Sequence, residues 1–171
     1  MAPTISSSSI LRAAAAPFPV SSFAPVPGNR IDELLVACEA LYRERVAAGE
    51  DGARGPVVSV AVCASSRDRC EHLRRAIRRR SKDFWGDAAR FSMRNTIEIH
   101  GRFHIYIGFY ADPFLHSLRG ASFDFVVYSA FALERMNPDV EIAVDLSLRR
   151  DVGQRVWLCE EDYAPFQGHV K

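Results

Sequence analysis

Several side chains have the types that metal or nucleophilic chemistry requires, but their spacing does not complete a site. Glu98, His100 and His104 could offer a carboxylate and two imidazoles to a metal ion. A predicted turn separates the two histidines and no fourth ligand follows in register, so a polar hairpin face is the favoured interpretation. Ser117 adjoins His116, yet neighbours in sequence rarely face each other as nucleophile and base. We therefore predict no metal, no cofactor and no catalytic residue.

A cation-rich stretch is the strongest local electrostatic feature. Between Arg67 and Lys82 the chain carries eight Arg or Lys residues against Asp68 and Glu71. Since the formal net charge is only +1, any case for a polyanionic partner rests on this segment. Two interpretations are open: a solvated helix face, and a contact surface for DNA phosphates or for an acidic partner protein. The predicted binding residues are Arg74, Arg75, Arg78, Arg79, Arg80 and Lys82.

The composition is that of one folded domain with a sizeable core. Of the 171 residues, 48% are hydrophobic and 25% are charged. No apolar run reaches the roughly 18 residues that span a bilayer, so no membrane association is predicted. The four cysteines lack CxxC spacing and fit an intracellular reducing compartment.

Residues 1–28 differ from the rest. They are rich in Ser, Ala and Pro and contain no acidic residue, which predicts a disordered tail followed by a single domain over residues 29–171. An organelle transit peptide is the alternative, although Arg12 is the only basic residue in this stretch.

Periodicity predicts alternating helices and strands. Asn29 can cap a helix that stops at Gly49, and the apolar run at 57–63 is typical of a strand covered on both faces. A second helix starts near Ser65, where Asp68 completes a pattern like a capping box. It carries the cations described above.

The second half of the chain completes an α/β pattern. Residues 97–107 predict a β-hairpin that turns at 100–102, and residues 123–128 predict a buried strand. Residues 137–150 combine strand-like alternation with helix end signals; we choose a helix, because a parallel strand at 155–159 needs a crossover. The predicted fold is a three-layer α/β sandwich with a mostly parallel sheet and one inserted β-hairpin.

Four short motifs accompany this order of elements: ALY at 40–42, ASSRD at 64–68, FWG at 84–86 and LRGASFD at 118–124. With these motifs, residues 31–162 resemble the ATPase domain of the terminase large subunit, the DNA-packaging motor of tailed phages and herpesviruses. The last motif is the most specific, because it is similar to the family's approach to its Walker B strand. The resemblance implies a P-loop-NTPase-like (RecA-like) sandwich.

The positions that match the nucleotide site depart from the family pattern. A phosphate-binding loop needs glycines, a Lys for the phosphates and a Ser or Thr for Mg²⁺. At the matching place, residues 23–30, only Gly28 fits, while Asn29 replaces the Lys and Arg30 replaces the Ser or Thr. The two Walker B carboxylates are replaced by Ser129 and Ala130, which cannot hold Mg²⁺ or orient water.

These departures predict a catalytically inactive, terminase-like protein that serves as a binding or structural component of a viral DNA-packaging or virion assembly, with protein partners. Two alternatives stay open. The chain could be a subunit whose missing groups are supplied in trans, or an organelle-imported α/β protein of unrelated function.

Overall fold

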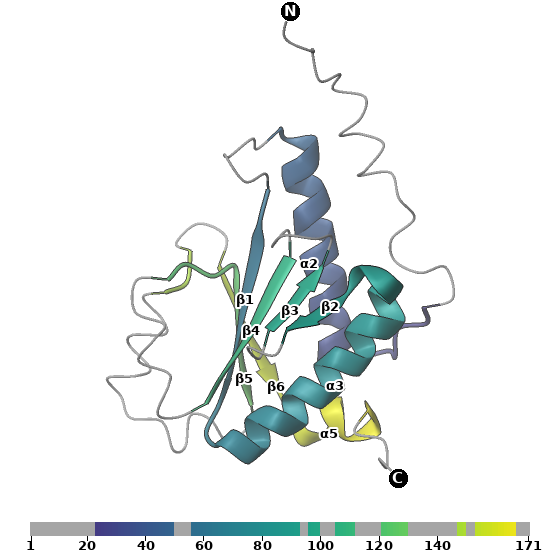
Figure 1. Ribbon diagram of the computed structural model, residues 1–171, viewed down its shortest axis with the longest axis vertical. Coiled ribbons are helices and arrows are strands. Elements are labelled where there is room, and N and C mark those ends of the chain that lie inside the picture. The colour runs from purple at the N-terminus through teal and green to yellow at the C-terminus, as the bar shows by residue number, and fades with distance from the viewer. Residues whose placement is uncertain are drawn as a thin grey trace, which may run out of the picture.

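The computed structural model describes residues 23–49, 56–92, 96–99, 105–111, 121–129, 147–149 and 153–166. In this part of the chain a six-stranded, mostly parallel sheet is packed against helices, so the protein is α/β (Figure 1). The helices are α2 (Arg30–Ala47), α3 (Arg67–Trp85) and α5 (Glu160–Tyr163), with 3-10 turns η1 (Gly86–Ala88) and η3 (Ala164–Phe166). The strands are β1 (Val58–Ala64), β2 (Arg90–Ser92), β3 (Thr96–Ile99), β4 (Ile105–Ala111), β5 (Phe125–Ser129) and β6 (Gln154–Leu158).

The strands lie in the order β2-β3-β4-β1-β5-β6. β4, β1, β5 and β6 are parallel, and Val60 of β1 pairs with Ile107 on one side and Phe125 on the other. β2, β3 and β4 pair in antiparallel fashion. The parallel β5–β6 pair agrees with the sequence prediction.

The predicted hairpin is present, but it is not an insertion. Ile99 of β3 pairs with Ile105 of β4, while the turn lies outside the described residues. β4 continues to Ala111 and joins β1 over its whole length. Its side chains, with Ile105 and Ile107 fully buried, give it enough apolar surface for a central position. The hairpin is therefore part of the main sheet.

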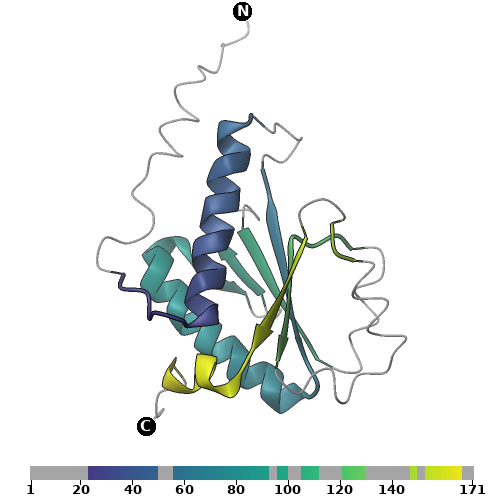
Figure 2. The same cartoon turned by 180° about the vertical axis from the view of Figure 1, so that it is seen from behind.

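Helices α2 and α3 cover the same face of the sheet, as the two opposite views show (Figure 2). Leu35 of α2 and Ile77 of α3 are fully buried against Val60 and Val62 of β1. The other face is also buried: Ala61 and the rest of a smaller apolar cluster have little or no exposure. Burial on both faces is compatible with a three-layer sandwich and explains the continuous apolar runs of the strands.

The helix ends follow the signals in the sequence. Asn29 caps α2 by accepting hydrogen bonds from the Ile31 and Asp32 amides at 3.0 and 3.2 Å. The cap of α3 is Ser66, one residue after the predicted Ser65, and it accepts from the Arg69 amide at 3.3 Å, so Ser65 and Asp68 do not form the predicted capping pair. Gly86, with φ of 58°, ends that helix.

The structure corrects two sequence predictions. Residues 147–149 are not helical: Leu148 forms an isolated parallel bridge with Phe123, because its side chain packs in the smaller apolar cluster. The rest of the helix predicted at 137–150 lies outside the described residues. The end of the predicted tail is packed, since Phe23 lies edge-on to Phe84 with ring centroids 4.7 Å apart. Residues 1–22 lie outside the described residues.

Candidate functional site

Two of the sequence-predicted nucleotide-site segments meet at the carboxyl edge of the parallel strands. α2 begins next to the end of β6, where the Asn29 side-chain amide donates to the Asp162 carbonyl at 2.7 Å and the Arg30 guanidinium donates to the Trp157 carbonyl. Ser129 ends β5 in register with Leu158 of β6. The segment 28–30 and Ser129 thus belong to one edge of the sheet, while Ala130 lies outside the described residues.

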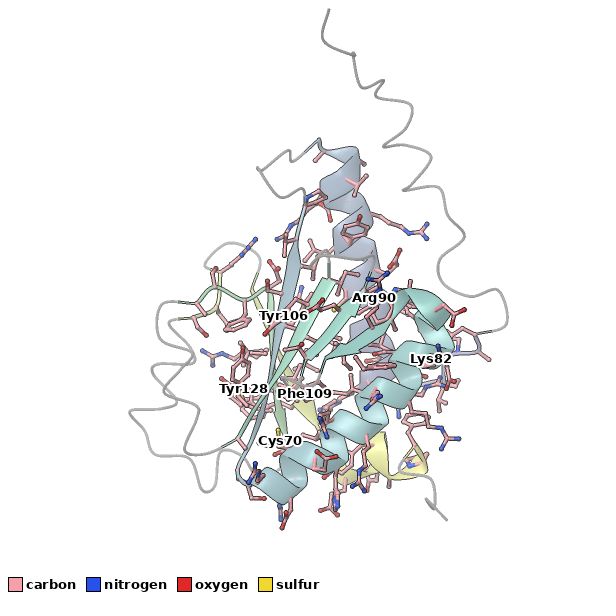
Figure 3. All side chains as sticks on the ribbon, viewed as in Figure 1. Cys70, Lys82, Arg90, Tyr106, Phe109 and Tyr128 are labelled. Carbon is pink, nitrogen blue, oxygen red and sulfur yellow. The ribbon has the colours of Figure 1, made fainter. Side chains whose placement is uncertain are left out.

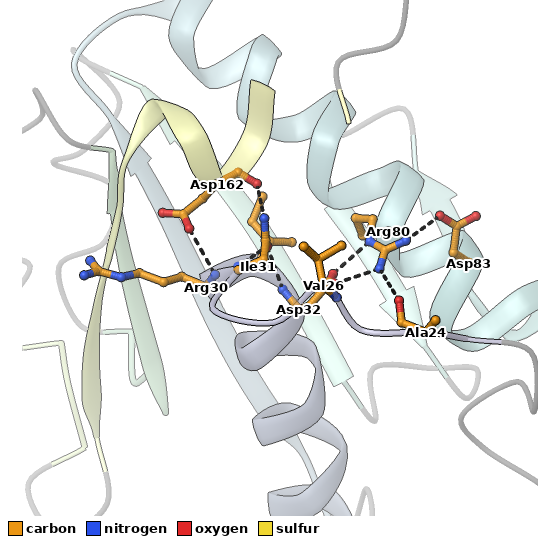
Figure 4. Close-up of polar contacts among 9 residues, drawn as sticks. Ala24, Val26, Arg30, Ile31, Asp32, Arg80, Asp83 and Asp162 are labelled. Atoms are coloured by element: carbon orange, nitrogen blue, oxygen red, sulfur yellow. Dashed lines mark hydrogen bonds and ion pairs between the residues drawn. The ribbon is translucent and has the colours of Figure 1, made fainter. Parts of the chain in front are cut away.

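The N-terminus of α2 is occupied by a carboxylate of the chain itself. Asp162 Oδ1 accepts a hydrogen bond from the Arg30 amide at 3.1 Å (Figure 4). Its Oδ2 accepts from the Cys159 amide at 2.7 Å. Asp162 is buried, and the next two amides of α2 already donate to Asn29. The amides and positive dipole end that would attract a phosphate are therefore satisfied internally.

The segment that carries Asp162 lies between the two long helices. α5 contacts both α2 and α3, and the following turn η3 packs on α3. Tyr163 is buried there, and burial raises the pKa of its hydroxyl. Residues 160–166 thus cover the carboxyl edge of the sheet on its helical face. The sequence signal for this role is slight: Asp162 closes a capping box with Cys159, three residues earlier.

Ser129, which the sequence comparison placed where the family has a magnesium-binding carboxylate, is buried at the end of β5. It is 1% exposed, and by strand alternation its side chain faces the helices together with Phe125 and Val127. Its Oγ has no hydrogen-bond partner in the described part of the chain. A neutral, buried hydroxyl carries no charge to balance a divalent cation.

The segment that the sequence analysis compared with a phosphate-binding loop, residues 23–30, is held on its other side by Arg80. Arg80 of α3 binds both carboxylate oxygens of Asp32, at 2.8 and 2.7 Å, and donates to the Ala24 carbonyl at 3.2 Å (Figure 4). The Val26 amide donates to Asp32 Oδ2 at 2.7 Å. These bonds fix residues 24–26 against α2 and α3, so their backbone is already committed and does not surround an anion.

Arg80 is therefore not part of an exposed cationic surface. It is buried, and its guanidinium lies over the rings of Phe23 and Phe166, at 4.7 and 4.6 Å from their centroids. Helical spacing is the signal in the sequence for the burial of Arg80. Position 80 continues the apolar series Cys70, Leu73, Ile77 and Phe84, so helical spacing places it on the buried side.

Helical spacing puts the other predicted binding residues together on one side of α3, where Lys82 is labelled in Figure 3. Arg75, Arg78, Arg79 and Lys82 are exposed, and Arg74 is partly exposed. Glu71 pairs with Arg74 at 2.7 Å and with Arg75 at 3.2 Å. Hydrogen bonds from Arg74 are the main cause that lowers the pKa of the Glu71 carboxyl.

The remaining candidates from the sequence do not form a site in the described residues. Glu98 is half-buried on β3, and His100, His104, His116 and Ser117 lie outside these residues. No group of three or more His, Cys, Asp or Glu suited to a metal occurs among the positions that are described. In the same part of the chain, no helix combines the length and apolarity that a membrane crossing requires.

Comparison with known proteins gives no match. No family model matches the chain, and no curated protein is significantly similar to it. The fold and the geometry described above are therefore the observations that bear on function.

Proposed function

We propose that this protein is a non-hydrolysing domain of terminase-like ATPase architecture that serves as a binding or structural component of a viral DNA-packaging or virion assembly. The proposal combines the motif resemblance with the arrangement of the carboxyl edge. In a nucleotide-hydrolysing domain of this class, the phosphate-binding helix N-terminus and the acidic strand end act on one Mg²⁺-nucleotide. Here the corresponding segments, 28–30 and 129, share one edge of the sheet. The first has no Lys to bind phosphates, and the second has no carboxylate to bind Mg²⁺.

The observation that carries the proposal is the bond between Asp162 and the first amide of α2. A helix N-terminus stabilises one anion well, and this one already holds a carboxylate that is buried and fixed by a second amide. A nucleotide phosphate would have to displace α5 and leave Asp162 charged beside it. Like charges in a buried site repel strongly, which opposes nucleotide binding.

The two polar side chains at the start of α2 that could contact a phosphate are bound to other parts of the chain. Arg30, at the position of the magnesium-binding hydroxyl, donates to the Trp157 carbonyl of β6. Asn29, at the position of the phosphate-binding Lys, caps α2 with its side-chain oxygen and donates its side-chain amide to the Asp162 carbonyl. These roles are structural, so the same residues support the fold in place of chemistry.

ATP binding and turnover by the full chain test the proposal directly. We expect no Mg²⁺-dependent binding of a fluorescent ATP analogue and no phosphate release, with or without duplex DNA. The double variant Ser129→Asp with Ala130→Glu should stay inactive, because the phosphate-binding Lys is still missing. Phosphate release by the wild-type chain alone would overturn the proposal. Release that occurs only after a partner subunit is added would instead favour a site completed in trans.

The variant Asp162→Ala tests whether the Asp162 carboxylate holds the N-terminus of α2. It removes the carboxylate from the α2 N-terminus and should cost about 1 kcal/mol of folding stability, the usual effect of losing a helix cap. Glu161→Ala, an exposed neighbour in α5, is the matched control and should change stability little. If Asp162→Ala were as stable as the control, the carboxylate would not be holding α2.

A further inference from the structure

We propose that the outer face of α3 binds the sugar-phosphate backbone of duplex nucleic acid, without reading the base sequence. The face, here called the α3 cationic face, consists of Arg74, Arg75, Arg78, Arg79 and Lys82. It is distinct from the nucleotide-site segments at the carboxyl edge. The inference therefore does not depend on whether the protein hydrolyses ATP.

The cations form one stripe because of helical spacing. Arg78 and Arg79 follow Arg75 by three and four residues, and Lys82 follows them by four and three. The four side chains therefore leave the same side of the helix. Arg67, at the start of α3, is also exposed. From Arg67 to Lys82 the helix rises about 22 Å, at about 1.5 Å per residue. This length is about that of six phosphates along one DNA strand.

The acidic residues around the stripe only partly neutralise it. Glu71 is shared between Arg74 and Arg75, while Lys82 pairs with Asp87 at 2.8 Å. Asp83 pairs with the buried Arg80, at 3.1 Å. Asp68 is exposed in the first turn, at the opposite end from Lys82. Among the described residues no carboxylate pairs with Arg78 or Arg79, the exposed pair at the centre of the stripe.

The character of the face favours a phosphate backbone over a protein partner. Protein interfaces need a desolvated centre that is usually aromatic or aliphatic. The large hydrophobic side chains that are exposed in the described residues, Val26, Val36 and Trp157, lie outside α3. A cation-rich face that shows no large exposed hydrophobic side chain among the described residues suits electrostatic binding to phosphates.

The same face favours duplex over single-stranded nucleic acid. Single strands are held largely by stacking of their bases on exposed aromatic rings. A ring beside the stripe, Phe91 on β2, is covered by the Arg78 guanidinium at 4.3 Å from its centroid. The arginines are left to contact phosphates, for which their planar, multi-donor head is well suited.

Fluorescence anisotropy with the full chain tests this inference. The probes are a short labelled duplex DNA, the duplex RNA and single-stranded DNA of the same sequence, and labelled polyglutamate. We expect both duplexes to bind regardless of sequence, with an affinity that falls steeply as salt rises. Single-stranded DNA and polyglutamate should bind at least about tenfold more weakly.

Neutral variants measure the contribution of the arginines. Arg75→Gln, Arg78→Gln and Arg79→Gln combined should reduce the slope of log K against log salt by about 2.7, which is about 0.9 for each lost phosphate contact. Glutamine has nearly the helix propensity of arginine, so the fold should persist, as circular dichroism will check. Arg79→Gln alone and Arg155→Gln, an exposed arginine on β6, form a matched pair, and only the former should lower the slope.

A gain of binding provides a test that misfolding cannot imitate. Glu71→Gln removes the carboxylate that competes for Arg74 and Arg75, so duplex affinity should rise by a few-fold at low salt. An unchanged slope in the triple variant, or equal loss in the Arg155→Gln control, would overturn the inference. Polyglutamate binding as tight as duplex binding would overturn it in favour of an acidic protein partner. Duplex binding by the α3 cationic face is measured independently of ATP turnover, so failure of the proposed function and failure of this inference can be told apart.

Discussion

Arg80 of α3 and Asp32 of α2 form a two-point ion pair, with Nε to Oδ1 at 2.8 Å and Nη2 to Oδ2 at 2.7 Å. Asp32 is 1% exposed, and Arg80 also contacts the rings of Phe23 and Phe166. One guanidinium thus joins both long helices to the segment before α2 and to the C-terminal turn η3. Hydrogen bonds raise the pKa of Arg80, and the bond to Asp32 has a larger effect than the bond to Asp83. Arg80 therefore stays charged across the working range of pH.

Removing the Arg80 cation should strongly destabilise the fold. Arg80→Met keeps most of the side-chain volume but leaves the Asp32 carboxylate buried without its partner, at a cost of about 3 kcal/mol or more. Urea unfolding followed by circular dichroism measures this loss. Arg79→Met, one position away and exposed, is the control and should change the free energy of unfolding by less than about 0.5 kcal/mol. Equal effects of the two substitutions would refute the assigned role of Arg80.

Asp124 is predicted to be a second buried determinant of stability. It is fully buried before β5 and accepts hydrogen bonds from the Arg45 guanidinium at 2.6 and 3.0 Å and from the Ser59 amide at 2.8 Å. Asp124→Asn would leave Arg45 without its countercharge, and we expect a loss of about 3 kcal/mol in urea unfolding. Glu44→Gln, at an exposed position of α2, should be nearly neutral. A near-neutral Asp124→Asn would contradict this prediction.

Gly108 is expected to resist substitution because two tyrosines meet over it. A Cβ at this position would lie 2.8 Å from Tyr110 Oη and 3.1 Å from Tyr106 Cε1. Burial raises the pKa of Tyr110, and Tyr106 adds to the effect. Gly108→Ala should therefore cost about 1–3 kcal/mol by overpacking, measured by urea unfolding. Combination with Tyr110→Leu should give less than the sum of the two losses, and strict additivity would count against the tyrosine contact.

Thiol reactivity should separate one cysteine from the other three. Burial raises the pKa of Cys63 to about 12 and that of Cys70 to about 11, and it also raises the pKa of the fully buried Cys38. At pH 8 these groups are protonated and inaccessible, so they should not react. Cys159 is exposed. A disulfide reagent should label one thiol quickly in the native protein and four after unfolding, and Cys159→Ser should abolish the fast phase. Two fast thiols in the native protein would contradict the burial pattern.

Some features could be predicted from sequence because they depend on neighbouring residues. The Asn29 cap of α2 and, to within one residue, the Ser66 cap of α3 involve hydrogen bonds within one turn of the helix. The apolar strands around β1 and β5 also followed from local periodicity. The short β2 was missed, since its three residues have no pattern of their own.

Other features depended on long-range contacts and were mispredicted or missed. Arg80 was grouped with the exposed cations by composition, and only its contact with Asp32, 48 positions earlier, shows that it is buried. Leu148 was assigned to a helix by its end signals, but a bridge to Phe123 holds it instead. The hairpin was expected beside the sheet because nothing local states that β4 will pair with β1.

Residue type and local spacing were enough to predict the α/β class, the start of α2 and the cation-rich helix, and motif comparison led to the prediction that positions 28–30 and 129 lack nucleotide-binding residues. Long-range packing determines which cations face solvent and places Asp162 at the N-terminus of α2. The amide and carboxylate that meet there are 132 positions apart. No local pattern encodes that pairing, because it arises from the packing of β6 and α5 against α2.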